Sequence, residues 1–174
     1  ISGKVLFFEN TDLKKGQKEI AEIRLDRPIY TFAGDRFVLR DWSKQFTIGG
    51  GVILDPSPPR RSYRTEKQKD FLIQRASKTT DAVIYLRSLL SRDHYIKSVN
   101  PLSQSVFSKT SISEALNQSE ALMFGDWIID KEWWTEVREA AGKRIKTIHE
   151  KHPELPGIDI SQLRTFMKKR VSDS

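Results

Sequence analysis

The residues best suited to chemistry form a basic cluster in the middle of the chain. Arg60, Arg61 and Arg64 lie around Tyr63, just after the proline-rich residues 55–59. Guanidinium groups pair bidentately with phosphates, and an aromatic ring can stack on a base or sugar, as at many RNA-binding sites. From composition alone, a solvated linker whose charges contact nothing is as well supported as an RNA-binding site. Both interpretations stay open at this point.

Positive charge is concentrated in and after this cluster. The 174-residue chain has 30 Lys and Arg against 23 Asp and Glu, a formal charge of +7 at pH 7 and a pI of about 9.6. Residues 1–59 hold 9 basic and 8 acidic side chains, whereas residues 60–174 hold 21 and 15. Residues 60–69 alone hold five basic side chains and one acidic one. This distribution suggests a polyanionic partner without requiring one.

No glycine loop in the sequence fits a nucleotide phosphate. A GxxxxGK[ST] or GxGxxG loop would present backbone N–H groups to the phosphates, and neither pattern occurs. Gly49, Gly50 and Gly51 form a cluster between expected strands rather than before a helix. We therefore interpret this cluster as a tight corner of a β structure where two backbones approach closely. No cofactor is expected to bind this chain.

The histidines and carboxylates do not form a metal-binding or catalytic constellation in the sequence. His149 and His152 have the spacing of two ligands on one helical face, but no third ligand is evident nearby. The dipole of a helix C-terminus favours histidines there, so a solvated pair is the preferred interpretation. Glu132, Glu136 and Glu139 have the spacing of an exposed helix face. We expect no bound metal and no catalytic residue, so the chain itself is not expected to be an enzyme.

Other features concern the compartment and the extent of the chain. Cysteine is absent, which excludes thiol chemistry and favours a reducing cytoplasm. A mean hydropathy of −0.53 predicts no membrane span. The first residues carry neither an initiator Met nor a signal-peptide pattern, so we expect a piece of a longer protein. We expect this piece to be a monomer.

The first third of the chain has the alternating pattern of short β-strands. Strands are expected at residues 4–9, 20–25, 29–32, 36–41 and 51–54. Turns are expected at residues 15–16, 33–35 and 49–51, where glycine supplies a positive φ. These short, closely spaced strands predict a sandwich or a partial barrel over residues 1–59.

Prolines at positions 56, 58 and 59 mark an expected domain boundary, because proline blocks both strand pairing and helix continuation. We expect residues 60–64 to form a Pro/Arg-rich linker. The units on either side of it are expected to keep a set distance without sharing a core.

After this boundary, the apolar period changes from about two residues to about 3.6. Two helices are expected before residue 95, the second with Asp81 near its start, followed by a break at residues 98–101. Further helical turns are expected at residues 102–107 and, capped by Ser111 or Ser113, up to Gln118. Strands at 122–124 and 127–129 are expected to form a hairpin. This order predicts a winged-helix domain, of the helix-turn-helix class, over residues 65–152.

A long helix from Asp130 to about His152 is expected to complete this domain. Residues 153–174 contain one amphipathic set, Leu163, Phe166 and Met167, and are expected to begin a further winged-helix unit.

Two expectations concern nucleic-acid binding by the winged-helix domain. Trp127, Trp133 and Trp134 are expected to fill its core rather than to stack on bases. The presumed recognition helix, residues 113–118, has Glu114 as its only charged side chain. That composition argues against reading DNA in the major groove.

Residues 21–61, AEIRLDRPIYTFAGDRFVLRDWSKQFTIGGGVILDPSPPRR, resemble the third domain of the selenocysteine-specific translation elongation factors, the SelB family. The resemblance rests on Gly34-Asp35-Arg36-Phe37-Val38-Leu39-Arg40-Asp41, Thr47-Ile48-Gly49-Gly50-Gly51, Leu54-Asp55-Pro56 and Pro59-Arg60-Arg61. The TxGxG corner is common to the wider EF-Tu superfamily, whereas its combination with the other segments is more specific. A looser resemblance at the Trp127 hairpin, the long helix and residues 149–153 extends it over nearly the whole chain.

The resemblance implies a mixed all-β plus α+β architecture, with a partial EF-Tu domain III-like β-barrel followed by a winged-helix domain. It implies that the parent protein binds GTP and Mg²⁺ before this chain and delivers selenocysteinyl-tRNA to the ribosome at UGA codons. A messenger hairpin would be recognised by a last winged helix after it. This chain would supply a tRNA-contacting barrel and a winged-helix spacer.

The resemblance also implies which residues contact RNA. In the superfamily this barrel touches the T-stem backbone of the tRNA, which implies a contact role for the glycine corner, where a ribose-phosphate can approach the main chain. Charge adds the neighbouring basic side chains, although Gln45-Phe46 stands where related barrels often have a basic residue. The candidate RNA-contact residues are Arg36, Arg40, Lys44, Thr47, Gly49, Gly50, Gly51, Arg60, Arg61 and Arg64.

The alternative hypothesis is a winged-helix DNA-binding transcriptional regulator with a β accessory domain. The weakly charged recognition helix and the barrel pattern of residues 35–41 favour the translation factor over it.

Overall fold

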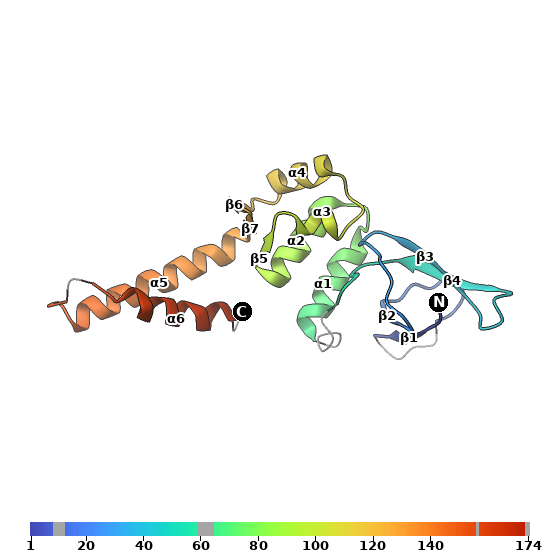
Figure 1. Ribbon diagram of the computed structural model, residues 1–174, viewed down its shortest axis with the longest axis horizontal. Coiled ribbons are helices and arrows are strands. Elements are labelled where there is room, and N and C mark those ends of the chain that lie inside the picture. The colour runs from blue at the N-terminus through green and yellow to red at the C-terminus, as the bar shows by residue number, and fades with distance from the viewer. Residues whose placement is uncertain (9–12, 59–64, 156, 173–174) are drawn as a thin grey trace.

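The computed structural model describes residues 1–8, 13–58, 65–155 and 157–172. Figure 1 shows an elongated arrangement in which a β region, a compact helical region and a long pair of helices follow one another along the molecule. The linker expected at residues 60–64 lies outside the described residues.

The β region contains two antiparallel strand pairs. β1 (Gly3–Phe7) pairs with β2 (Ala21–Leu25), and β3 (Arg36–Arg40) pairs with β4 (Thr47–Val52). The described strands form two separate sheets rather than a closed barrel. These four strands overlap the expected ones, but the strand expected at residues 29–32 is wrong.

A local turn replaces that strand. The hydroxyl of Thr31 and the backbone N–H of Phe32 both donate to the carboxylate of Asp35, at 2.9 and 2.7 Å. These bonds fold the segment back on itself, and Tyr30 is fully exposed there. The apolar side chains of residues 29–32 led to the prediction of a strand. The hydrogen bonds to the Asp35 side chain form a turn there instead.

The helical region holds four helices and three strands among the described residues. In chain order its elements are α1 (Glu66–Ser77), α2 (Ala82–Asp93), β5 (Tyr95–Lys97), α3 (Asn100–Ser103), α4 (Lys109–Gln118), β6 (Leu122–Phe124) and β7 (Trp127–Ile129). Asp81 caps α2 as expected, accepting from the backbone N–H groups of Val83 and Ile84. The β6–β7 hairpin is confirmed, and its turn contains Gly125 with a φ of 56°.

Three elements of this region differ from the expectation. β5 was not predicted, and it pairs with β7 to give the sheet order β5-β7-β6. Pro101 lies in the first turn of α3 instead of breaking the chain, because a first-turn residue needs no N–H donor. α4 begins at Lys109 and is capped by Ser108, which accepts from the Ser111 N–H at 3.1 Å.

A long helix and a shorter one form the far end of the molecule. α5 (Lys131–Lys151) is capped by Asp130, which accepts from the Trp133 N–H at 2.7 Å, and α6 (Ile160–Ser172) runs back along it (Figure 1). The guanidinium carbon of Arg144 lies 5.5 Å from the centre of the Phe166 ring. Across the described ranges, none of the helices combines the length and apolarity that crossing a membrane requires.

The three tryptophans expected in the core are not buried. Trp127 and Trp134 are 38% and 36% exposed, and Trp133 is half-buried. The core consists instead of aliphatic residues, such as Leu86 and Ile128, both 0% exposed, and of the smaller rings of Phe71 and Tyr85. Aromatic content alone could not distinguish these positions from core positions.

One hydrophobic core joins the β region to the helices. Ala33, 3% exposed, belongs to the same buried cluster as Phe71 and Leu86, and Phe8, Ile20 and Leu54 pack against that cluster. The expectation that the two units share no core is therefore wrong.

Backbone contacts reinforce this junction. The N–H of Ala33 donates to the C=O of Gln104 at 2.8 Å, and the N–H of Val106 donates to the C=O of Ala33 at 3.0 Å. Gly34 has a φ of 99°, and a Cβ there would lie 2.4 Å from a methyl group of Val106. Glycine thus permits both the turn and the close approach of the two regions.

Candidate nucleic-acid interface

The β3–β4 hairpin presents basic side chains on one face. Arg36, Val38 and Arg40 alternate with Phe37 and Leu39, and the first three are exposed while the other two are half-buried. Because strand side chains alternate between faces, the two guanidinium groups share the outer face with Val38 between them.

The strand facing them adds no bulk at the centre of this face. The register pairs Val38 with Gly50 and Arg40 with Thr47, with an irregularity between Leu39 and Arg40. The outer face therefore holds the two arginines with the exposed Val38 between them and a glycine opposite Val38.

The loop at the end of the hairpin is held by Asp41. Its carboxylate takes a hydrogen bond from the Ser43 hydroxyl and accepts from the Phe46 N–H at 2.8 Å. These bonds, that of the hydroxyl first, lower the pKa of Asp41 below its usual value. The resulting turn gives Lys44 a φ of 60° and places its C=O 3.4 Å from a guanidinium nitrogen of Arg40. The Arg40 side chain thus contacts the backbone of the loop that holds Lys44.

The three glycines lie within β4 and do not form a turn. Among the described residues, the glycines with a positive φ are Gly16, Gly34 and Gly125. The turn expected at residues 49–51 is therefore wrong, whereas glycines at the other two expected turns do have a positive φ.

The close approach of Phe37 explains two of the three glycines in β4, Gly50 and Gly51. A Cβ on Gly50 would lie 2.6 Å from the carbonyl oxygen of Phe37, and one on Gly51 would lie 2.7 Å from the Phe37 ring. A Cβ on Gly49 would meet nothing within 4 Å. Gly50 and Gly51 are therefore required by the hairpin itself, and Gly49 alone faces open space.

The structure brings seven of the ten candidates together on this hairpin, namely Arg36, Arg40, Lys44, Thr47, Gly49, Gly50 and Gly51. Arg60, Arg61 and Arg64 lie outside the described residues, so their part in the interface stays a prediction. No group of three or more His, Asp or Glu side chains within the described ranges could hold a metal ion.

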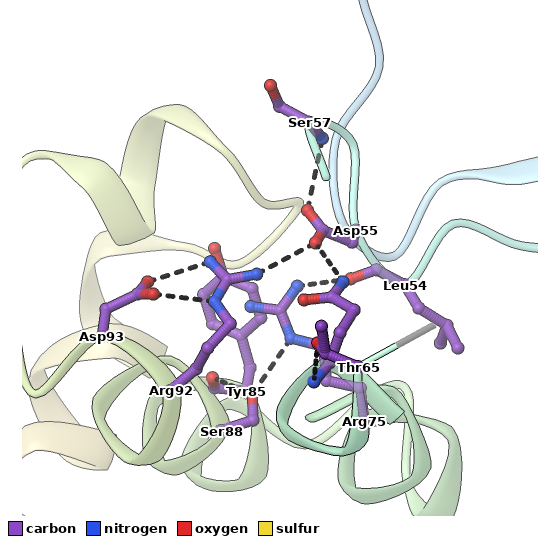
Figure 2. Close-up of polar contacts among 10 residues, drawn as sticks. Leu54, Asp55, Ser57, Thr65, Arg75, Tyr85, Ser88, Arg92 and Asp93 are labelled. Atoms are coloured by element: carbon purple, nitrogen blue, oxygen red, sulfur yellow. Dashed lines mark hydrogen bonds and ion pairs between the residues drawn. The ribbon is translucent and has the colours of Figure 1, made fainter. Parts of the chain in front are cut away.

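Sequence reasoning missed a polar cluster that fixes the hairpin relative to the helices (Figure 2). Asp55, just after β4, accepts from Arg92 of α2 and from Gln68 of α1, both at 3.0 Å. The Asp55 and Arg92 side chains are only 9% and 17% exposed. The only sequence signal was the position of Asp55 in the Leu54-Asp55-Pro56 motif.

Arg75 adds a second link in the same cluster. It is 5% exposed, donates to the Ser88 hydroxyl at 3.0 Å and to the C=O of Leu54, and burial lowers its pKa to about 10. Its guanidinium carbon lies 4.1 and 4.4 Å from the ring centres of Phe71 and Tyr85. Such cation–π contacts, together with the hydrogen bonds, compensate the desolvated charge.

Comparison with known proteins gives a consistent family. Residues 1–60 match the β-barrel domain of selenocysteine-specific elongation factors. The factor of that name from Haemophilus influenzae is 24% identical over 163 residues, which are 93% of this chain and 26% of the relative. The factor from Desulfomicrobium baculatum is 32% identical over 56 residues, 32% of this chain and 9% of the relative.

A third relative, the selenocysteine-specific elongation factor of Escherichia coli, is 30% identical over 82 residues, 47% of this chain and 12% of the relative. The chain thus spans about a quarter of the length of the Haemophilus influenzae protein at most.

Proposed function

Because this chain belongs to the family of selenocysteine-specific elongation factors, we propose that it helps such a factor to deliver selenocysteinyl-tRNA to the ribosome at UGA codons. In this proposal the β3–β4 hairpin contacts the tRNA backbone. The messenger hairpin is bound by a part of the protein outside this chain.

The observation that carries the proposal is the outer face of β3–β4. Arg36 and Arg40 lie on it together, and none of the positions that share this face in the paired strands is acidic. Arginine pairs bidentately with phosphate, and backbone contacts of this kind position a nucleic acid without reading its sequence. A tRNA stem presents a matching row of phosphates.

The helical region acts as a spacer in this proposal. The order α2, β5, α3, α4, β6 and β7, with the sheet order β5-β7-β6, supports the interpretation of residues 65–152 as a winged-helix domain. Its α4 carries only Lys109 and Glu114 as charged residues. A DNA-reading helix needs more basic and polar side chains, so the regulator hypothesis is the weaker candidate.

We also propose that this chain neither binds nor hydrolyses GTP, and that GTP and Mg²⁺ are bound by another part of the protein. What supports this proposal is that the sequence contains no GxxxxGK[ST] or GxGxxG loop of the kind that binds nucleotide phosphates. Micromolar binding of labelled GTP by the chain would contradict this.

The tRNA contact is tested by measuring affinity for selenocysteine tRNA against salt concentration. The double variant Arg36→Ala/Arg40→Ala is expected to reduce the slope of log K against log salt by about 1.8, at roughly 0.9 for each lost phosphate contact. The matched control, Arg138→Ala/Arg164→Ala, removes the same charge from α5 and α6. Equal slopes for the two double variants would refute a contact at the hairpin.

A further inference from the structure

We propose that the outer face of the β5-β7-β6 sheet binds unpaired bases of single-stranded RNA by stacking them on aromatic side chains. This site lies in the helical region rather than on the β3–β4 hairpin (Figure 1), and it does not depend on the tRNA contact proposed above.

The strand register gives this sheet one buried face and one aromatic face. Lys97 lies opposite Trp127, and Trp127 lies opposite Phe124. Directly opposite residues of antiparallel strands share a face, so these three side chains form one row. Ile96 and Ile128 alternate with them and are 5% and 0% exposed. The core therefore takes the other face of the sheet and leaves this one outward.

The aromatic side chains on this face remain accessible, and Tyr95 and Trp127 contact each other. Tyr95, Trp127 and Phe124 are 41%, 38% and 76% exposed. The Tyr95 ring centre lies 5.6 Å from that of Trp127 and 5.7 Å from that of Trp133. His94 in turn lies 5.4 Å from Trp133, with the two rings nearly parallel at 7°.

These distances join four rings into a continuous series that runs from β5 and β7 to the start of α5. Rings that already hold one another in place lose little conformational freedom when a base stacks on them. The four rings are thus preorganised to bind ligands that have flat aromatic faces, such as bases.

The charge on this face suits a nucleotide. One of its six positions is charged, and it is basic; the positions are Tyr95, Lys97, Leu122, Phe124, Trp127 and Ile129. The Lys97 ammonium lies 5.8 Å from the centre of the Trp127 ring. A base on the ring would bring its phosphate within reach of this ammonium.

Unpaired RNA fits these features better than a duplex or a protein. Bases in a duplex already stack on their neighbours, whereas unpaired bases stack on exposed rings with little sequence preference. A protein partner would be expected to cover an apolar face with apolar side chains, and such a contact would not need the ammonium group of Lys97. The excess of basic over acidic residues in positions 60–174, 21 against 15, adds attraction for RNA.

The test uses an end-labelled, unstructured oligouridylate, whose binding to the chain is followed by fluorescence anisotropy. Trp127→Ala is expected to weaken binding roughly tenfold or more, in line with the loss of one base–aromatic stack. Trp134→Ala is the matched control, because Trp134 has nearly the same exposure, 36% against 38%. Lys97→Gln is expected to reduce the salt slope by about 0.7, the value for one phosphate of a single strand.

Trp127→Leu keeps most of the apolar area and removes the ring, so it carries the test if Trp127→Ala does not fold. The proposal is overturned if the parent chain does not bind the oligouridylate. It is also overturned if Trp127→Ala and Trp127→Leu bind like the parent. Binding of an RNA duplex of equal length as tightly as the single strand would overturn it as well.

Discussion

Asp55 accepts from two helices of the helical region, through Gln68 of α1 and Arg92 of α2. Asp55→Ala would remove the carboxylate that accepts from Arg92 and from Gln68, whereas Arg92 would keep its pair with Asp93. Breaking a buried pair from one side costs roughly 3–5 kcal/mol, and partial exposure of Arg92 favours the lower end. We therefore expect urea denaturation to give a loss of about 3 kcal/mol in the free energy of unfolding.

Asp93→Ala supplies the matched control for this measurement. Asp93 also pairs with Arg92, at 2.8 Å, but its side chain is 36% exposed. An exposed pair contributes roughly 0–1 kcal/mol, so the loss is expected to stay below about 1 kcal/mol. Equal losses for the two variants would show that Asp55 has no special role at the junction.

Single residues with local effects were predicted well, and residues with distant partners were not. Asp81 and Asp130 cap helices because a side chain needs only the next few N–H groups, which the sequence itself displays. Asp55, in contrast, meets Gln68 and Arg92 across 13 and 37 residues. No local pattern contains that information.

At the scale of the element, the β3–β4 hairpin depends on two glycines of β4. Gly50→Ala and Gly51→Ala would each place a methyl group within 2.7 Å of Phe37. Overpacking of this kind costs roughly 1–3 kcal/mol, so thermal denaturation is expected to register a loss in that range for each variant.

Gly49→Ala is the matched control within the same strand. Its methyl group would meet nothing within 4 Å, and an exposed substitution without new contacts changes stability by about 0.5 kcal/mol or less. If Gly49→Ala destabilises the chain as much as its neighbours do, the glycines are not explained by contact with Phe37.

Elements with strong local signals were predicted nearly to their ends, and weak or ambiguous ones were not. The β6–β7 hairpin was fixed in advance by Gly125-Asp126 between two apolar runs. β5 is as short as β6 and β7, but its partner β7 is distant in sequence, so no turn beside it marked the pairing. The exposed rings of Trp127 and Trp134 have the same sequence pattern as a buried stripe, because periodicity does not reveal which face a neighbour covers.

The site was predicted in part for the same reason. Charge alone pointed to Arg36, Arg40 and Lys44, and all three lie on the β3–β4 hairpin or its loop. The close approach of two backbones expected at the glycine cluster is found at Gly50, beside the carbonyl oxygen of Phe37. The RNA contact expected at Gly50 stays a prediction.

At the scale of the whole molecule, the shared core predicts one cooperative unfolding transition. Ala33 and Leu54 bury against the same cluster as Leu86 of α2, so loss of either region exposes the interface of the other. Amide signals of the β3–β4 hairpin and of α2 are expected to disappear at the same urea concentration in NMR spectra. Two separate midpoints would indicate independent units.

The central claim, that the outer face of β3–β4 lies against tRNA, is tested most directly by site-specific crosslinking. A photoreactive amino acid at Val38, which is 66% exposed between Arg36 and Arg40, is expected to crosslink to the stem of selenocysteine tRNA. The same group at Ile160, 67% exposed on α6, is expected to give no crosslink. A crosslink from Ile160 and none from Val38, or equal yields from both, would contradict the claim.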